Sequence, residues 1–111
     1  MQRKYEENNI FQKIINRELP AKIHYEDEKA ICFYDINPKA PIHLLLIPKE
    51  GFVSFNDFVK NSDDGDIAYF FKTAQKIAEN LDVKSYRIVA NCGEEAGQVV
   101  FHFHLHIMGY R

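Results

Sequence analysis

The sequence predicts an α+β fold in which one long helix packs against a five-stranded antiparallel sheet. Residues 62–82 carry apolar side chains at helical spacing, and five shorter runs are rich in β-branched and aromatic residues. A doubly wound parallel sheet would need a crossover helix between successive strands, and the chain offers only one long helix. Its 111 residues, 46% of them hydrophobic, suit a single domain spanning residues 1–111.

The N-terminal third predicts a short helix and a hairpin, after a few polar residues that we expect to be loosely held. Asn9 is placed to cap a helix with an apolar stripe, and Pro20 is expected to end it. Strands are predicted over residues 22–26 and 30–34, with the charged turn 27–29 between them.

The middle of the chain predicts a loop and then a strand inside the sheet. Residues 35–41 contain two prolines with Asn and Asp, which favours a loop. Residues 42–47 are apolar except for His43, as expected of a strand buried on both faces, and residues 48–51 should end it. His43 is therefore expected in a central strand.

The second half predicts the long helix and two further strands. Helical spacing runs from residue 62 or 63 to residue 82, with acidic residues in the first turn, where the helix dipole favours them. Strands are predicted over residues 86–91 and 99–108, and a glycine-containing loop over residues 92–97.

Three of the five histidines stand at alternate positions of the last predicted strand: His102, His104 and His106. Successive strand side chains point to opposite faces, so these three imidazoles should share one face. Histidine serves as nucleophile, acid or base near neutral pH, and packing alone poorly explains such a row. The opposite face, expected to pack on the long helix, carries Val99, Phe101, Phe103, Leu105 and Ile107.

The spacing of the histidine row argues against a metal site. Same-face neighbours on a strand are about 6.5 to 7 Å apart, so the outer pair is separated by about 13 Å. Zinc needs its nitrogen ligands about 2.0 to 2.1 Å from one ion, and no cluster with zinc spacing occurs elsewhere in the chain. The pattern suits a central reactive histidine flanked by two helpers, with His43 available from a neighbouring strand. We therefore expect no metal.

Charge and composition argue against several classes of partner. A net charge of −2 with interspersed signs gives no basic patch for nucleic acid or an anionic membrane. The longest apolar run, residues 42–48, is far shorter than the roughly 20 residues needed to cross a bilayer. Cys32 and Cys92 form no CxxC pair and follow no secretory signal, which predicts reduced thiols in a cytoplasmic protein.

Long, ordered motifs along nearly the whole chain resemble the histidine-triad (HIT) superfamily. Its signature is similar to residues 91–111, with Gly97-Gln98 and His102-Phe-His-Leu-His-Ile-Met-Gly-Tyr-Arg111. Its Hint branch is similar to Ile10-Phe-Gln-Lys-Ile-Ile15, Leu19-Pro-Ala-Lys-Ile23, Phe33-Tyr-Asp-Ile-Asn-Pro-Lys-Ala-Pro-Ile-His43 and Leu46-Ile-Pro-Lys49. The resemblance implies a HIT-like fold and a homodimer that binds purine mononucleotides such as AMP or GMP. It also implies hydrolysis of adenosine 5′-phosphoramidates without a metal or other cofactor.

The resemblance implies a role for each histidine of the cluster. His104 would be the nucleophile that attacks the α-phosphorus, giving an adenylyl-histidine intermediate that water then cleaves. A backbone carbonyl near His102 would hold the other ring nitrogen of the nucleophile. His106 would contact the phosphate, while His102 and His43 would complete the cluster and support proton placement.

The resemblance also implies the nucleotide contacts. Asp35 matches the residue that accepts hydrogen bonds from both ribose hydroxyls, although without the resemblance an Asx-type turn explains it equally well. The matches to the base pocket are apolar residues that would otherwise be interpreted as core, namely Phe11, Leu19, Phe33 and Ile36. The phosphate loop matches Asn91, Gly97 and Gln98, followed by Val99.

Other functions remain open at this point. Val99 stands where Hint proteins often place a small hydroxyl residue that bonds the leaving group, and valine offers no such bond. One alternative is a dinucleoside polyphosphate hydrolase of the Fhit branch, although the tail Gly109-Tyr-Arg111 and residues 47–49 favour Hint. A nucleotide-binding or scaffold module with weak hydrolysis is the alternative from another class.

Overall fold

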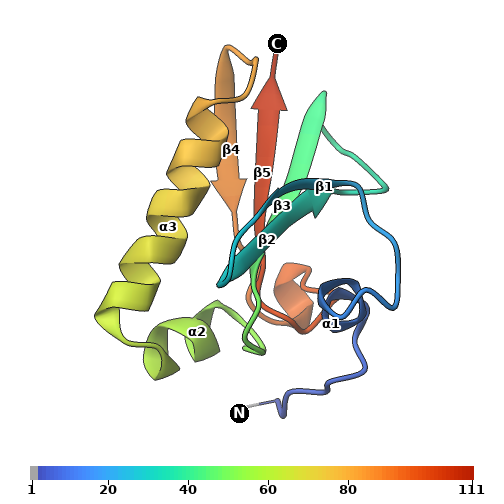
Figure 1. The fold of residues 1–111 in the computed structure, drawn as a ribbon, viewed down its shortest axis with the longest axis vertical. Coiled ribbons are helices and arrows are strands. Elements are labelled where there is room, and N and C mark those ends of the chain that lie inside the picture. The colour runs from blue at the N-terminus through green and yellow to red at the C-terminus, as the bar shows by residue number, and fades with distance from the viewer. Residues whose placement is uncertain (1–2) are drawn as a thin grey trace.

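One antiparallel sheet organises the chain, and helices cover both of its faces (Figure 1). The computed structural model describes residues 3–111. The five strands lie in the order β1-β2-β3-β5-β4, which confirms the predicted α+β class and places β3 at the centre. The elements are α1 (Ile10–Ile15), β1 (Ile23–Glu26), β2 (Ala30–Tyr34), β3 (Ile42–Pro48), α2 (Phe55–Asn61), α3 (Asp64–Glu79), β4 (Ser85–Val89), the 3-10 helix η1 (Glu94–Ala96) and β5 (Leu105–Tyr110).

Alternation along the central strands separates the two faces of the sheet. Leu44 of β3 lies opposite Ile107 of β5, and both side chains belong to the core beneath α3. Leu45 lies opposite His106, and both side chains face the other way. One face of the sheet is therefore closed by the long helix, and the other carries histidine.

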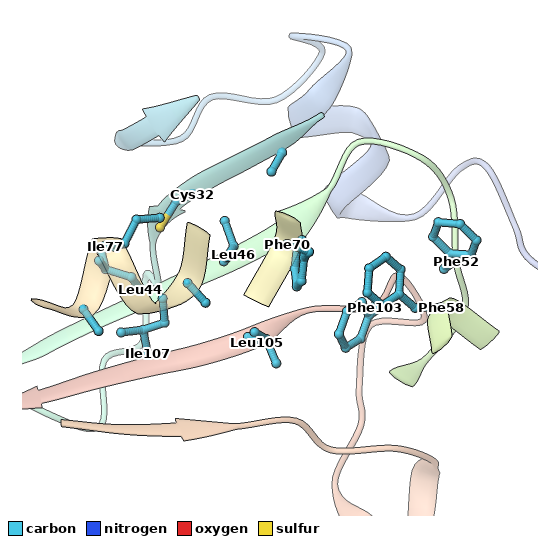
Figure 2. Close-up of a cluster of buried hydrophobic side chains, with 13 residues drawn as sticks. Cys32, Leu44, Leu46, Phe52, Phe58, Phe70, Ile77, Phe103, Leu105 and Ile107 are labelled. Carbon is cyan, nitrogen blue, oxygen red and sulfur yellow. The ribbon is translucent and has the colours of Figure 1, made fainter. Parts of the chain in front are cut away.

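The face beneath α3 holds the larger core (Figure 2). Phe58 of α2 stacks on Phe103 with ring centroids 4.9 Å apart, and Phe70 of α3 lies 5.3 Å from the same ring. Burying a phenylalanine side chain completely contributes about 1.5 to 3 kcal/mol. Phe103 thus anchors the segment before β5 to the helical layer. Three residues predicted to pack on the long helix do so: Phe103, Leu105 and Ile107.

The long helix α3 follows the predicted spacing and ends three residues earlier than expected, at Glu79. Asp63 caps it, because its Oδ1 accepts a hydrogen bond from the backbone N–H of Asp66 at 2.8 Å. Within residues 3–111, no helix has the length and apolar character needed to cross a membrane.

The helix α2 is an element that the sequence pattern does not predict. Its seven residues are too few for periodicity to distinguish a helix from a loop. The available signal was the capping pattern. Ser54 Oγ accepts from the N–H of Asp57 at 3.4 Å, and the Asp57 carboxylate accepts from the N–H of Val53 at 2.7 Å.

The last strand is shorter than predicted, which changes where its first histidine lies. β5 begins at Leu105 rather than at residue 99, because the N–H of Phe103 donates to the carbonyl of Phe52 at 2.6 Å, outside the sheet ladder. His102 consequently lies in the interior with no exposed surface, and not on an open face. Val99 and Phe101 were both predicted for the core. Val99 is instead 83% exposed, and Phe101 is half-buried.

Three element ends also differ from prediction. α1 ends at Ile15, well before Pro20, because the chain turns at Arg17, whose φ of 64° is left-handed. β3 continues one residue further than predicted, through Pro48. β4 ends at Val89, two residues before the predicted boundary.

Candidate active site

A cavity of about 820 Å³ opens on the sheet face that α3 leaves uncovered. It is lined by most of the predicted site residues: His43, His104, His106, Asp35, Ile36, Phe33, Phe11, Leu19, Asn91, Gly97 and Val99. His102 and Gln98 do not line it. A second cavity, of about 220 Å³ beside Tyr69 of α3, contains none of the predicted site residues. Most of the predicted site residues therefore meet at the larger cavity.

His104 presents one ring nitrogen as an unprotonated lone pair. Its Nδ1 lies 2.7 Å from the backbone carbonyl oxygen of His102, and a carbonyl only accepts hydrogen bonds, so Nδ1 carries the proton. Burial lowers the pKa of His104 below its usual 6.5, so the ring is neutral at pH 7. The Phe11 ring packs edge-on against it at 4.9 Å. Nε2 therefore keeps its lone pair, in a ring whose orientation is fixed.

His43 and His106 form a hydrogen-bonded pair whose proton positions follow in the same way. The backbone N–H of Lys39 donates to His43 Nδ1 at 3.0 Å, so the proton of His43 is on Nε2. That Nε2 lies 2.9 Å from Nδ1 of His106, which accepts the bond and must carry its own proton on Nε2. His106 therefore offers an N–H donor beside the His104 ring, whose centroid is 5.1 Å away.

Both members of this pair are held in the neutral form. Burial is the main cause that lowers the pKa of His106 to about 4, and the neighbouring His104 and His43 lower it further. Burial also lowers the pKa of His43, against the attraction of the Asp35 carboxylate. Neutral rings with fixed protons direct hydrogen bonds without carrying charge into the cavity.

Asp35 serves the loop after β2 and the cavity at once. Its Oδ1 accepts the backbone N–H of Asn37 at 2.8 Å, which is the turn that the sequence alone suggests. Its Oδ2 lies 3.5 Å from His43 Nε2 at the cavity wall. One carboxylate oxygen is thus committed to the fold, and the other is available to a ligand.

The same three side chains, Asp35, His43 and His106, have ligand atoms within 4.8 Å of one another, as a bound metal would require. A metal at His43 Nε2 would need the lone pair at that atom, and hence a proton on Nδ1. The N–H of Lys39 already points at Nδ1, so that tautomer would bring two donors together. The backbone therefore favours a hydrogen-bonded pair over a metal centre.

His102 lies behind the cavity wall and not in it. Its Nε2 is 2.7 Å from the carbonyl oxygen of Pro48, and its Nδ1 is 2.6 Å from the Tyr5 hydroxyl. Burial lowers the pKa of His102 to about 4. The His102 ring therefore packs behind the cavity, and the backbone carbonyl of His102 holds the His104 ring.

The loop predicted to bind phosphate is built around Gly97 and Gln98. Gly97 has a φ of 100°, which a residue with a side chain rarely adopts. The Gln98 amide group donates to the carbonyls of Val53 and Val100 at 2.7 and 3.1 Å, and its oxygen accepts the N–H of Gly93 at 2.9 Å. The Gln98 side chain is thus used by the backbone and shapes the loop from beneath.

The apolar wall combines core residues with one that packing cannot explain. Phe11 and Phe33 are buried and meet edge-on at 5.5 Å, so they serve the core as well as the cavity. Leu19 is partly exposed beside them. Ile36 is 90% exposed, and an isoleucine at the rim of a cavity suits contact with a flat, apolar ligand group.

Several groups that define the site were not predicted from the sequence. The carbonyl of Pro48 and the N–H of Lys39 are backbone groups, and every residue has such a carbonyl, so the residue types at these positions do not predict the contacts. Tyr5 belongs to the segment expected to be loosely held, yet its hydroxyl reaches His102. Arg87 of β4 also lines the cavity, on the same strand face as Val89, and exposure along β4 does not distinguish it from its neighbours.

Comparison with known proteins identifies the family of the chain. The family model of the HIT domain matches residues 16–111. An uncharacterized HIT-like protein of Rickettsia prowazekii is 43% identical over 107 residues, which make up 95% of this chain and 89% of that protein. A HIT family hydrolase from Clostridium thermocellum is 46% identical with a TM-score of 0.82, over 96% of this chain and 93% of that one. A hypothetical histidine triad nucleotide-binding protein from Sulfolobus tokodaii is 33% identical with a TM-score of 0.79, over 88% and 66% respectively.

We expect the free energy of unfolding to fall as the pH drops from 6.5 toward 4. The folded pKa values of His102 and His106 are about 4, whereas an unfolded histidine titrates near 6.5, so the unfolded chain binds more protons in this window. The slope is at most about 1.4 kcal/mol per pH unit for each histidine. Urea unfolding at a series of pH values measures it.

The matched variants are His106→Gln, which should flatten this slope, and His24→Gln, which should not. His24 lies on exposed β1, outside the cavity. A free energy of unfolding that stays constant from pH 7 to pH 5 would contradict the neutral, buried cluster.

Proposed function

The chain belongs to the HIT domain family, and on that premise we propose that it is a nucleotide hydrolase of the Hint type that cleaves adenosine 5′-phosphoramidates. The observation that carries the proposal is the 2.7 Å contact between His104 Nδ1 and the His102 carbonyl. It leaves a neutral imidazole with a free Nε2 at a cavity wall. The Sulfolobus relative, a hypothetical nucleotide-binding protein, points to the same class of ligand.

In the proposed first step, His104 Nε2 attacks the α-phosphorus. The Nε2–P bond forms as the P–N bond breaks, and its electron pair leaves with an amine whose nitrogen has already taken a proton from solvent. The N–H at His106 Nε2 donates to a phosphate oxygen, where negative charge develops. The product of this step is adenylyl-His104 together with the free amine.

In the second step, water attacks the same phosphorus. The Nε2–P bond breaks, its electrons return to the imidazole, AMP departs, and the proton of the water passes to solvent. The His102 carbonyl holds the Nδ1 proton of His104 through both steps, so the ring returns to its starting tautomer. Neither step requires a metal or other cofactor.

We propose that a purine nucleotide binds in the cavity in one direction. The free oxygen of Asp35 would accept the ribose hydroxyls, with the base against Ile36 and the phenylalanine pair Phe11 and Phe33. Phosphate would lie near Asn91 and the backbone N–H groups beside Gly97, where the left-handed glycine allows close approach. Leu19 and Val99 complete the wall, and Gln98 supports the loop.

Two alternatives each have one observation in their favour. The cavity of about 820 Å³ extends to Arg87 on β4, which would suit the further phosphates of a dinucleoside polyphosphate. Val99 is 83% exposed at the cavity and offers no hydrogen bond to a leaving group, which would suit a binding module with weak hydrolysis. Comparing turnover of a phosphoramidate and of a dinucleoside polyphosphate distinguishes these functions.

The free thiols of Cys32 and Cys92 support a cytoplasmic setting.

We expect His104→Ala to fold and to bind AMP, but to lose turnover of an adenosine phosphoramidate by about a thousandfold or more. The substitution removes the nucleophile and leaves the ribose, base and phosphate contacts in place. Calorimetry measures AMP binding, and release of amine measures turnover. His24→Ala is the matched control and should behave as wild type. Hydrolysis above about a tenth of the wild-type rate would falsify the nucleophile assignment.

Activity is expected to be independent of metal. The proton positions of His43 and His106 suit hydrogen bonding, so dialysis against a strong chelator should leave kcat and KM unchanged. Elemental analysis of the dialysed protein confirms that metal has been removed. Activity that disappears on dialysis and returns with zinc would overturn this expectation.

We also propose that the protein is a homodimer in which each sheet extends the other through β4. β4 is an edge strand, and its Tyr86 and Ile88 side chains are 42% and 38% exposed. With α3 beside it, this edge offers an isologous apolar surface. Light scattering at tens of micromolar should give about twice the 13.0 kDa chain mass.

The interface is tested by Ile88→Lys, which should yield monomer because a two-fold contact would bring two like charges together. Val59→Lys on α2 is the control, since Val59 is similarly exposed and lies away from β4. A wild-type monomer at these concentrations would contradict the dimer and weaken the assignment to Hint.

A further inference from the structure

The N-terminal segment reaches the rear of the active site through Tyr5. Its hydroxyl lies 2.6 Å from His102 Nδ1, and its ring meets the His102 ring edge-on at 5.6 Å. The ring also lies directly over Gly51, where an added Cβ would be 2.5 Å from Tyr5 Cε2. Gly51 thus leaves the space that the tyrosine ring fills.

The direction of the Tyr5 hydrogen bond follows from the other side of the His102 ring. Nε2 faces the carbonyl oxygen of Pro48 at 2.7 Å and must donate, so a neutral ring has its lone pair on Nδ1. The Tyr5 hydroxyl therefore donates to Nδ1. Both nitrogens of a fully buried ring are then satisfied, one by Pro48 and the other by Tyr5.

Gln12 of α1 completes this arrangement. Gln12 Oε1 lies 2.9 Å from the Tyr5 hydroxyl oxygen and Gln12 Nε2 lies 3.3 Å from Asn16 Oδ1, and a half-turn of the amide exchanges its two ends. One hydroxyl proton cannot serve two acceptors, so the amide must present its NH₂ group to Tyr5 when His102 takes the proton. The chain of hydrogen bonds then runs from Gln12 through Tyr5 to His102, whose carbonyl holds His104.

We propose that Tyr5 is a positioning residue of the active site. Its hydroxyl fixes the His102 ring, and the backbone carbonyl of His102 in turn fixes the tautomer of His104. For turnover, this inference rests on the hydrolase proposed above. For the tautomer, it rests only on the contacts of residues 5, 12, 48, 102 and 104. Without the hydroxyl, Nδ1 of His102 would have no donor and the ring could turn, which would loosen the carbonyl that orients the nucleophile.

Two substitutions separate the hydrogen bond from packing. Tyr5→Phe removes only the hydroxyl. Gln12→Glu keeps the tyrosine ring but places a carboxylate beside its hydroxyl, which competes with His102 for the proton because a carboxylate only accepts. Tyr25→Phe is the matched control, since the Tyr25 hydroxyl bonds Asp27 at 2.7 Å on exposed β1.

The experiment combines steady-state kinetics with ¹⁵N NMR of the histidine rings in the full chain. We expect Tyr5→Phe and Gln12→Glu to lower kcat on an adenosine phosphoramidate by about tenfold, with KM changed less than twofold, because nucleophile orientation and not nucleotide contact is affected. In both variants the His102 Nδ1 resonance should move, and the His104 resonances should shift from a single tautomer toward an average. Tyr25→Phe should change none of these.

The kinetic and spectroscopic measurements test the two proposals separately. Unchanged His104 resonances in both variants would overturn the positioning role, whatever the rates. So would a fall in kcat no larger than that caused by Tyr25→Phe. If the wild-type chain does not turn over the phosphoramidate, the hydrolase proposal fails, and the NMR shifts alone decide whether Tyr5 sets the His104 tautomer.

Discussion

The contact on which the candidate site depends is the 2.7 Å hydrogen bond from His104 Nδ1 to the carbonyl of His102. Imidazole has two nitrogens of similar basicity, and a free ring exchanges its proton between them. A backbone acceptor two residues away breaks that symmetry without introducing a charge. The lone pair is therefore always on the nitrogen at the cavity, and a neutral ring is sufficient for nucleophilic attack.

That geometry requires the chain to leave the sheet before His104. In a regular strand, a side chain does not bond the carbonyl of the residue two positions earlier on the same face. Here β5 begins only at Leu105, and the preceding residues are held by Phe52 and by the aromatic cluster around Phe103. The core beneath α3 thus determines the backbone path that orients a ring on the opposite face.

The sequence indicates much of this site because the types of its side chains and their spacing along the strands are characteristic. The row of histidines and the apolar run around His43 identify the two central strands, and alternation correctly places Leu105 and Ile107 beneath α3. The same alternation wrongly extends the strand back to Val99, because a period of two cannot show where ladder hydrogen bonds begin. The spacing distinguishes the central histidine from its two neighbours, but only the fold shows that His102 is fully buried while His106 reaches the cavity.

The missing information is mostly in the backbone. The groups that assign every proton in the cluster are the carbonyls of Pro48 and His102 and the N–H of Lys39, and any residue type could supply them. α2 was missed for a related reason, since a seven-residue helix is defined by its cap at Ser54 more than by its pattern. Tertiary contacts of this kind have no local sequence signature.

The three histidines of the row therefore differ in what they present: His104 a lone pair at the cavity, His106 an N–H donor, and His102 a backbone carbonyl. His102 has no surface in the cavity, so its contribution passes through its carbonyl and through the groups that hold its ring. His106 is oriented by His43, which is itself oriented by a backbone N–H. Burial lowers the pKa of each ring, and each has a defined tautomer, which backbone groups set for His102 and His104 and which His43 sets for His106. In such a cluster, the direction of each hydrogen bond determines which ring nitrogen carries a proton and which presents a lone pair.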